Sequence, residues 1–282
     1  MALINYSPTN HEQQSRLHDG VDHIVLVVRS LGPACTLLQR LGFALTATNG
    51  HPTLGTVHRL VQLRDSYLEV LAIARPGPSL SALAASLETG RDLCRLALHS
   101  RDADHSAAIL LNRSVPVSEV MRFRRPISGD EPERGMLGFR VVIPEWQAFD
   151  GLPVFFCEHE NRALTIPLQP VHHPNGAVRI SGLEASVPDP SKSVKCLHHL
   201  LDASLTGQTM CLRDVLVTFV APRDGGAAAW TGVTVEVVDL AACRELLRAH
   251  GVRLASDGPT LLVEPSPELP VSIRFASAAQ NG

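Results

Sequence analysis

A histidine and a glutamate in two apolar stretches are the residues of this chain that best suit chemistry. His23 lies within Val21–Val28, and Glu69 lies within Tyr67–Ile73. A carboxylate inside an apolar strand is costly to bury unless it is paired, hydrogen-bonded or bound to a metal. Histidine and carboxylate together suit Zn, Fe, Mn or Ni, and such a site needs ligands from separate strands on one face. His58, in the stretch between them, is placed to face the same cleft.

A second group of candidates lies in the stretch that ends with Cys157, Glu158 and His159. Successive strand residues face opposite sides of a sheet, so Glu158 and His159 cannot both point into one cleft. We expect His159 to point inward, on the same face as Cys157. No separate general base is evident, and Glu158 and His58 are the candidates for that role.

The segment from His172 to Gly176 is predicted to be a loop, because Pro-Asn-Gly is strong turn chemistry. Such a loop can close over the cleft and contribute His173. The alternative is a linker between two halves of the chain, with an exposed histidine pair.

Each residue of the main pair also has a plainer interpretation. A lone strand histidine such as His23 is more often a core residue bonded to a backbone carbonyl. Glu69 can instead pair with Arg59 or Arg29 across the sheet. For His23 alone, or for Glu69 alone, the plainer interpretation is preferable to a metal site. Because both residues fall in the first and last strands of one unit, we favour the metal site.

The elements that position these residues form a repeated β-α-β-β-β unit. The stretch 21–28 is rich in β-branched residues and predicts a buried strand. Apolar residues at helical spacing follow from 34 to 41, and Gly42 ends that helix. Residues 43–47, 57–63 and 67–73 then predict three strands.

Four helix caps mark four such units, and they are Ser30, Asp102, Asp189 and Asp239. The third unit is expected to be one strand short. We predict an α+β fold of tandem βαβββ modules, paired into half-open curved mixed β-sheets with helices on the outer face. The expected division is a polar tail at 1–20, a first domain of two modules at 21–176, and a second, degenerate domain at 177–282.

The composition excludes several classes of protein. Of the 282 residues, 45% are hydrophobic and 19% charged, which is typical of a globular chain. The net charge of −3 does not indicate the positively charged surface by which proteins bind nucleic acid. Scattered cysteines without a C-x-x-C pair favour reduced thiols and a cytoplasmic location. No apolar run is long enough to span a bilayer. Phosphate loops, G-x-S-x-G and H-E-x-x-H are absent from the sequence.

The segments around His23 and Glu69 resemble those of the vicinal oxygen chelate superfamily. The segment 21–26, followed by a helix ending at Leu41-Gly42-Phe43, resembles the opening of those proteins. The continuation His51-Pro52, Gly55-Thr56 and Tyr67-Leu68-Glu69 is similar to its glyoxalase-like branch, as are the segments 155–159 and 173–177. The resemblance extends to Ala177 and is thin beyond it.

This resemblance implies a divalent metal that chelates two neighbouring oxygens of a small-molecule substrate. By the same resemblance, His23 and Glu69 are metal ligands and His159 is the third. The chain departs from the best-known patterns, because Arg95 stands where the second module's first-strand ligand belongs. Gly182 and Gly232 stand at that position in the last two modules.

We therefore expect a metal-dependent glyoxalase-like enzyme of the lyase, isomerase or dioxygenase type. Its metal would be Zn, Mn, Fe or Ni, and a homodimer is the default assembly. The alternative is a metal-free protein of the same fold that sequesters a small molecule, as in antibiotic resistance. Such proteins bind through aromatic walls, and aromatic residues are only 4% of this chain.

Overall fold

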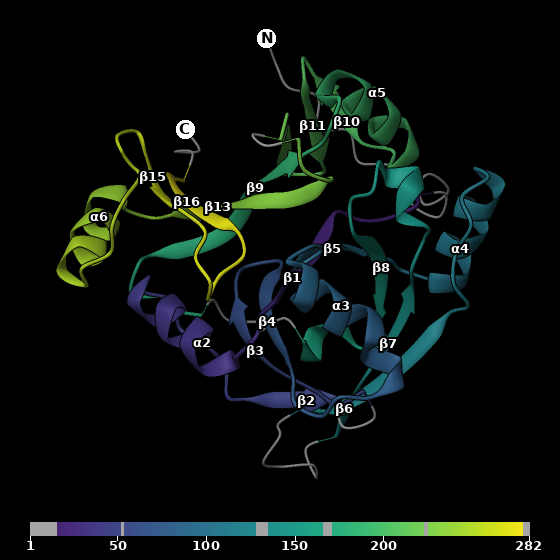
Figure 1. Ribbon diagram of the computed structural model, residues 1–282, viewed down its shortest axis with the longest axis horizontal. Helices are drawn as coiled ribbons and strands as arrows, with labels where there is room; N and C mark the ends of the chain where they lie inside the picture. The colour runs from purple at the N-terminus through teal and green to yellow at the C-terminus, as the bar shows by residue number, and fades with distance from the viewer. Residues whose placement is uncertain (1–15, 52–53, 128–134, 166–170, 223–224, 279–282) are drawn as a thin grey trace.

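The computed structural model describes residues 16–51, 54–127, 135–165, 171–222 and 225–278. Its strands form two eight-stranded mixed sheets (Figure 1). The first sheet has the order β2-β3-β4-β1-β5-β8-β7-β6. Its strands are β1 (Val21–Val27), β2 (Asn49–His51), β3 (Thr56–Gln62), β4 (Tyr67–Ile73), β5 (Cys94–His99), β6 (Met121–Pro126), β7 (Met136–Val142) and β8 (Val154–His159).

The second sheet repeats this arrangement with the order β10-β11-β12-β9-β13-β16-β15-β14. Its strands are β9 (Ala177–Ser186), β10 (Ser204–Thr206), β11 (Thr209–Leu212), β12 (Val215–Val220), β13 (Ala229–Val237), β14 (Ser256–Asp257), β15 (Thr260–Val263) and β16 (Ser272–Ser277). The second sheet thus begins at Ala177, while the division into two domains stays a prediction.

Each sheet consists of two βαβββ units joined through their first strands. In the first sheet, β1 pairs in parallel with β4 and antiparallel with β5, and β5 pairs in parallel with β8. In the second sheet, β9 and β13 are antiparallel to each other and take the places of β1 and β5. The predicted fold class is confirmed.

Helices cover the outer faces of both sheets, where most of the apolar core lies. They are α2 (Leu31–Arg40), α4 (Ala103–Asn112), α5 (Pro190–Leu200) and α6 (Leu240–Ala249). Leu38 of α2 and Leu110 of α4 are fully buried in this core. Short 3-10 turns lie at Pro78–Leu80, Trp146–Phe149 and Arg162–Leu164. Among the described helices, none is both long and apolar enough to cross a membrane.

The first sheet curves until its two edge strands nearly meet. The side-chain amide nitrogen of Asn49 in β2 donates to the backbone carbonyl oxygen of Pro126 in β6 over 3.0 Å. In Figure 1, β2 and β6 accordingly lie side by side at the foot of the molecule. The sheet therefore encloses an interior, lined by the side chains that face away from the outer helices.

A helix on the inner side of the first sheet fills one part of that interior. This helix is α3 (Ser81–Thr89), between β4 and β5. Leu83 of α3 is buried against Val25 and Val27 of β1, and Leu71 of β4 packs against the same cluster. The rest of the interior contains the polar residues described below.

Several strand predictions were wrong at the sheet edges. Residues 43–47 do not form a strand, and the first unit's edge strand is β2, a little further along the chain. Phe43 is instead held by stacking on Phe275, and Thr46 bonds to Leu60. The third unit is not one strand short, because it contains β10. Since β10 is exposed throughout, it has no alternation of apolar residues by which to recognise it.

The helix caps allow a direct test of local stability. The Asp239 side chain accepts from the backbone nitrogens of Ala241 and Ala242 over 2.8 and 3.0 Å, whereas Ser30 makes no side-chain cap bond. Replacement of Asp239 by Ala should lower the free energy of unfolding by about 1 kcal/mol, measured by urea titration. Ser30→Ala, the matched control, should change it by less than about 0.5 kcal/mol. Equal losses in the two variants would contradict the role of the cap.

Candidate metal centre

Glu69 lies at the centre of a group of histidines in the interior of the first sheet. It stands in β4 opposite Leu60 of β3, and its side chain is 12% exposed. Its Oε2 lies 3.7 Å from Nε2 of His23. Its Oε1 lies 3.6 Å from Nδ1 of His58 and 3.9 Å from Nε2 of His51. The structure therefore brings the predicted pair, His23 and Glu69, together and adds two further histidines.

The ring of His23 is held in one orientation. It stacks on Tyr67 at 4.5 Å between ring centroids and meets the edge of Phe155 at 5.5 Å. Its Nδ1 donates to Oδ2 of Asp22 over 2.7 Å. Because an ionised carboxylate only accepts hydrogen bonds, Nδ1 carries the proton and Nε2 presents its lone pair to the side of Glu69.

His51 and His58 have ring nitrogens without hydrogen-bond partners. Among the described residues, Nδ1 of each is buried and unbonded. Burial lowers the pKa of His58 to about 4, although Glu69 acts in the opposite direction. Burial alone would raise the pKa of Glu69, but the neighbouring His51, His58 and His23 lower it below its usual range. At neutral pH the group thus consists of a carboxylate beside a neutral His58.

These donors fit a transition metal. Separations of 3.6 to 3.9 Å between Glu69 and the histidine nitrogens are too long for hydrogen bonds. Two ligands about 2.1 Å from one ion lie roughly 3.0 to 3.4 Å apart, so a small inward movement would suffice. One donor atom from each of His51, His58 and Glu69 also lies within 4.8 Å of the others. The unpartnered nitrogens and the mixed nitrogen and oxygen donors suit Zn, Fe, Mn or Ni.

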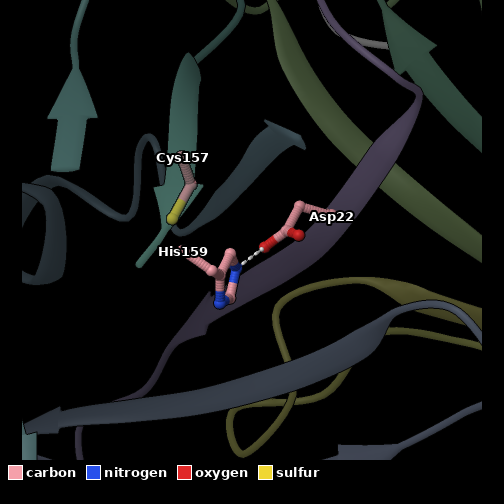
Figure 2. Close-up of side chains that lie close together, drawn as sticks. All are labelled: Asp22, Cys157 and His159. Atoms are coloured by element: carbon pink, nitrogen blue, oxygen red, sulfur yellow. Dashed lines mark hydrogen bonds and ion pairs between the residues drawn. The ribbon is translucent and has the colours of Figure 1, made fainter. Parts of the chain in front are cut away.

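His159, the predicted third ligand, lies in a second group beyond Asp22. Its Nε2 donates over 2.7 Å to the same Oδ2 of Asp22 that accepts from His23 (Figure 2). Arg162 donates to the other oxygen of that carboxylate. Burial alone would raise the pKa of Asp22, but the bonds from His159 and His23 hold it well below its usual range. Asp22 is therefore a carboxylate already neutralised by protein donors.

The other nitrogen of His159 is also engaged, since Nδ1 lies 3.1 Å from the hydroxyl of Thr165. Cys157 belongs to the same group. Burial raises the pKa of its thiol, which keeps the sulfur protonated. This second group thus has fewer open donor atoms than the group around Glu69. The ligand role of His159 and the place of Cys157 in a cleft stay predictions.

Glu158 points to the opposite side of β8, as strand alternation requires. Its Oε2 accepts from the backbone nitrogen of Ala103 and from Arg140, both over 2.8 Å. These contacts attach the start of α4 to the sheet. The role of Glu158 as a general base stays a prediction, and its position next to α4 does not favour that role.

His173 has both ring nitrogens bonded to backbone atoms. Nδ1 accepts from the backbone nitrogen of Ala44 over 3.0 Å, and Nε2 lies 2.8 Å from the carbonyl oxygen of Gln62. The residue is 2% exposed. This arrangement fixes the loop against β3. The contribution of His173 to a substrate cleft stays a prediction.

A small cavity adjoins the group around Glu69. Its volume is about 120 Å³, and His58 forms part of its wall. Arg125 of β6 and Gln62 of β3 also line it. The cavity therefore lies between the histidine group and the seam at which β2 and β6 meet.

Three residues of this region were missed from the sequence. His51 comes just before Pro52 in a stretch without strand alternation, so nothing in the pattern assigned it to a face. Arg125 stood in a run of arginines that is typical of an exposed edge. Asp22 is next to His23 in β1, and strand alternation would place the two side chains on opposite faces. A β-bulge at that point, between Val21 and His23, allows the two side chains to meet.

A sequence profile described as a glyoxalase-like domain matches residues 21–201. The chain belongs to this family. The family and the paired βαβββ units together confirm the resemblance to the vicinal oxygen chelate superfamily. No curated protein is detectably similar in sequence.

Solved structures share the fold of this glyoxalase-like protein. A crystal structure of a hypothetical protein from Staphylococcus aureus aligns with a TM-score of 0.63 and 14% identity, over 92% of this chain and 99% of the other. A xylose isomerase-like TIM barrel/4-hydroxyphenylpyruvate dioxygenase fusion protein aligns with a TM-score of 0.60 and 16% identity, over 94% of this chain and 50% of the other. The chain thus spans half the length of the fusion protein. At these identities the likeness shows the fold alone.

The buried carboxylate of Asp22 gives a stability prediction. Asp22→Asn should lower the free energy of unfolding by about 3 kcal/mol, because Arg162 loses its buried counter-charge and two histidines lose an ionised hydrogen-bond acceptor. Urea titration at neutral pH measures this loss. The matched control is Asp202→Asn, whose pair with Arg113 lies at the surface with Asp202 40% exposed, so a loss within about 0.5 kcal/mol is expected. A loss for Asp22→Asn no larger than for the control would exclude this role.

Proposed function

We propose that this glyoxalase-like protein is a metal-dependent enzyme that acts on a small oxygenated molecule, as a lyase, isomerase or dioxygenase. The observation that carries the proposal is the convergence of His23, His51 and His58 on Glu69, whose carboxylate oxygens lie 3.6 to 3.9 Å from one nitrogen of each ring. Among the described residues, Nδ1 of His51 and of His58 has no hydrogen-bond partner. Buried polar groups without partners are costly, and a bound ion would remove that cost.

We assign the ligands to His23, Glu69 and His58, with His51 as the neighbouring fourth donor. This set differs from the one implied by the family resemblance, in which His159 was the third ligand. Supporting the change, both nitrogens of His159 already have partners, whereas Nδ1 of His58 has none among the described residues. Zn, Mn, Fe and Ni all remain compatible with these donors.

The protein residues around the site would fix its geometry. Asp22 holds the proton of His23 on Nδ1, which leaves Nε2 for the ion, as carboxylates behind metal-bound histidines commonly do. Tyr67 and Phe155 prevent the His23 ring from turning. A divalent ion held there supplies Lewis acidity to two neighbouring oxygens of a substrate. With His58 as a ligand, His51, whose Nε2 lies 3.9 Å from Glu69, is the candidate that would accept a substrate proton when it does not itself bind the ion.

The metal-free alternative, a protein that sequesters a ligand, receives less support. Sites for drug-sized ligands usually have volumes of roughly 300 to 1,000 Å³, whereas the cavity beside His58 has about 120 Å³. A compact substrate suits this space better. The cytoplasmic location and the homodimer expected from the sequence stay predictions.

Metal content tests the proposal directly. Protein purified without an affinity tag should contain close to one transition-metal ion per chain, measured by inductively coupled plasma mass spectrometry. Glu69→Gln should weaken metal affinity by at least about 100-fold, because it removes a ligand and not merely an outer contact. Glu158→Gln makes the same chemical change on the other face of the sheet and should keep the metal.

A histidine series separates the two ligand sets. His58→Ala should lose the metal and His159→Ala should retain it, with circular dichroism used to verify that each variant is folded. The reverse result would restore His159 as the third ligand. Wild-type protein without metal after reconstitution with each of the four ions would exclude the proposed function.

A further inference from the structure

Arg125 is a buried cation in the wall of the cavity beside His58. It lies in β6 opposite Leu137 of β7, and only 5% of it is exposed. Its neighbour Arg124 points outward, with a side chain that is 69% exposed. Strand alternation therefore separates two arginines of one strand into an interior and a surface residue.

The guanidinium of Arg125 lacks an ionic partner among the described residues. Its one hydrogen bond there is a long one, of 3.4 Å, to the carbonyl oxygen of Pro126. It also lies 5.4 Å from the centroid of the Phe139 ring. Burial lowers the pKa of Arg125, while Tyr67 and Glu69 act in the opposite direction. A buried charge without a close counter-charge is expensive, and an anionic ligand beside it would remove that cost.

The rest of the cavity wall leaves this role to Arg125. Among the described residues of the lining, it is the one charged side chain. The amide nitrogens of Asn49 and Gln62 already donate to the carbonyl oxygens of Pro126 and Thr165, each over 3.0 Å. The guanidinium is thus the strong donor that remains, and its planar fork matches a carboxylate.

We propose that Arg125 binds the carboxylate of a small 2-hydroxy or 2-oxo acid. The oxygen on the carbon next to that carboxylate would then face His58 and Glu69. The inference rests on the proposed function and names its substrate class. A cavity of about 120 Å³ is smaller than the cavity of about 150 Å³ that accepts the six carbons of benzene, so it holds roughly five or six non-hydrogen atoms. Acids of two or three carbons have this size. Arg125 is thus a specificity-determining residue.

A charged and a neutral ligand of equal shape test this assignment. Lactate and lactamide differ in the carboxylate alone, and their dissociation constants can be measured by isothermal titration calorimetry on the full-length protein, with and without metal. Wild type should bind lactate at least about tenfold more tightly than lactamide, as expected of a charge-assisted pair. Arg125→Gln should abolish this preference and leave metal content unchanged. Arg124→Gln, the matched control, should keep both.

The outcomes distinguish this inference from the proposed function. Metal binding without any preference for lactate, or a preference that survives Arg125→Gln, would overturn the role of Arg125 and leave the metal site standing. A lactate preference that depends on Arg125 in a protein that binds no metal would support the anion site and refute the metal-dependent function. Should Arg125→Gln fail to fold, Arg125→Lys keeps the charge without the fork. It should reduce the preference several-fold, and an unchanged preference would refute bidentate binding.

Discussion

The antiparallel pairing of β1 with β5 is the constraint on which the rest of the first sheet depends. It joins two βαβββ units through their first strands and curves the sheet until β2 approaches β6. The same pairing contains the bulge that places Asp22 beside His23. A single irregularity in the central ladder therefore provides the carboxylate that orients the first proposed ligand and binds His159.

Much of the framework could be predicted from the sequence, because it depends on local patterns. Caps and helical spacing identified the four units, and the exceptional presence of Glu69 within an apolar strand identified the centre of the histidine group. The missing parts depend on long-range geometry. His51 comes from a short edge strand, α3 joins two units, and Arg125 depends on which face of an edge strand turns inward. None of these follows from periodicity in one chain.

The second sheet shows that topology alone does not produce such a centre. It has the strand order of the first, yet polar side chains of its central strands satisfy one another. Arg179 donates to both oxygens of Glu236 over 2.7 Å, and Thr231 donates to Glu184 over 2.8 Å. Within the described parts of the chain, groups of metal-binding donors occur in the first sheet. The difference lies in side chains placed on a common scaffold.

The position of α3 has a consequence for where a small molecule can bind. This helix fills one part of the interior with leucine side chains, so the polar residues around Glu69 face the part that remains. The wall of the cavity there comes from β2, β3, β6, β7 and nearby loop residues. A molecule in that cavity would contact His58 and the seam of β2 and β6, and it would not touch the leucines of α3.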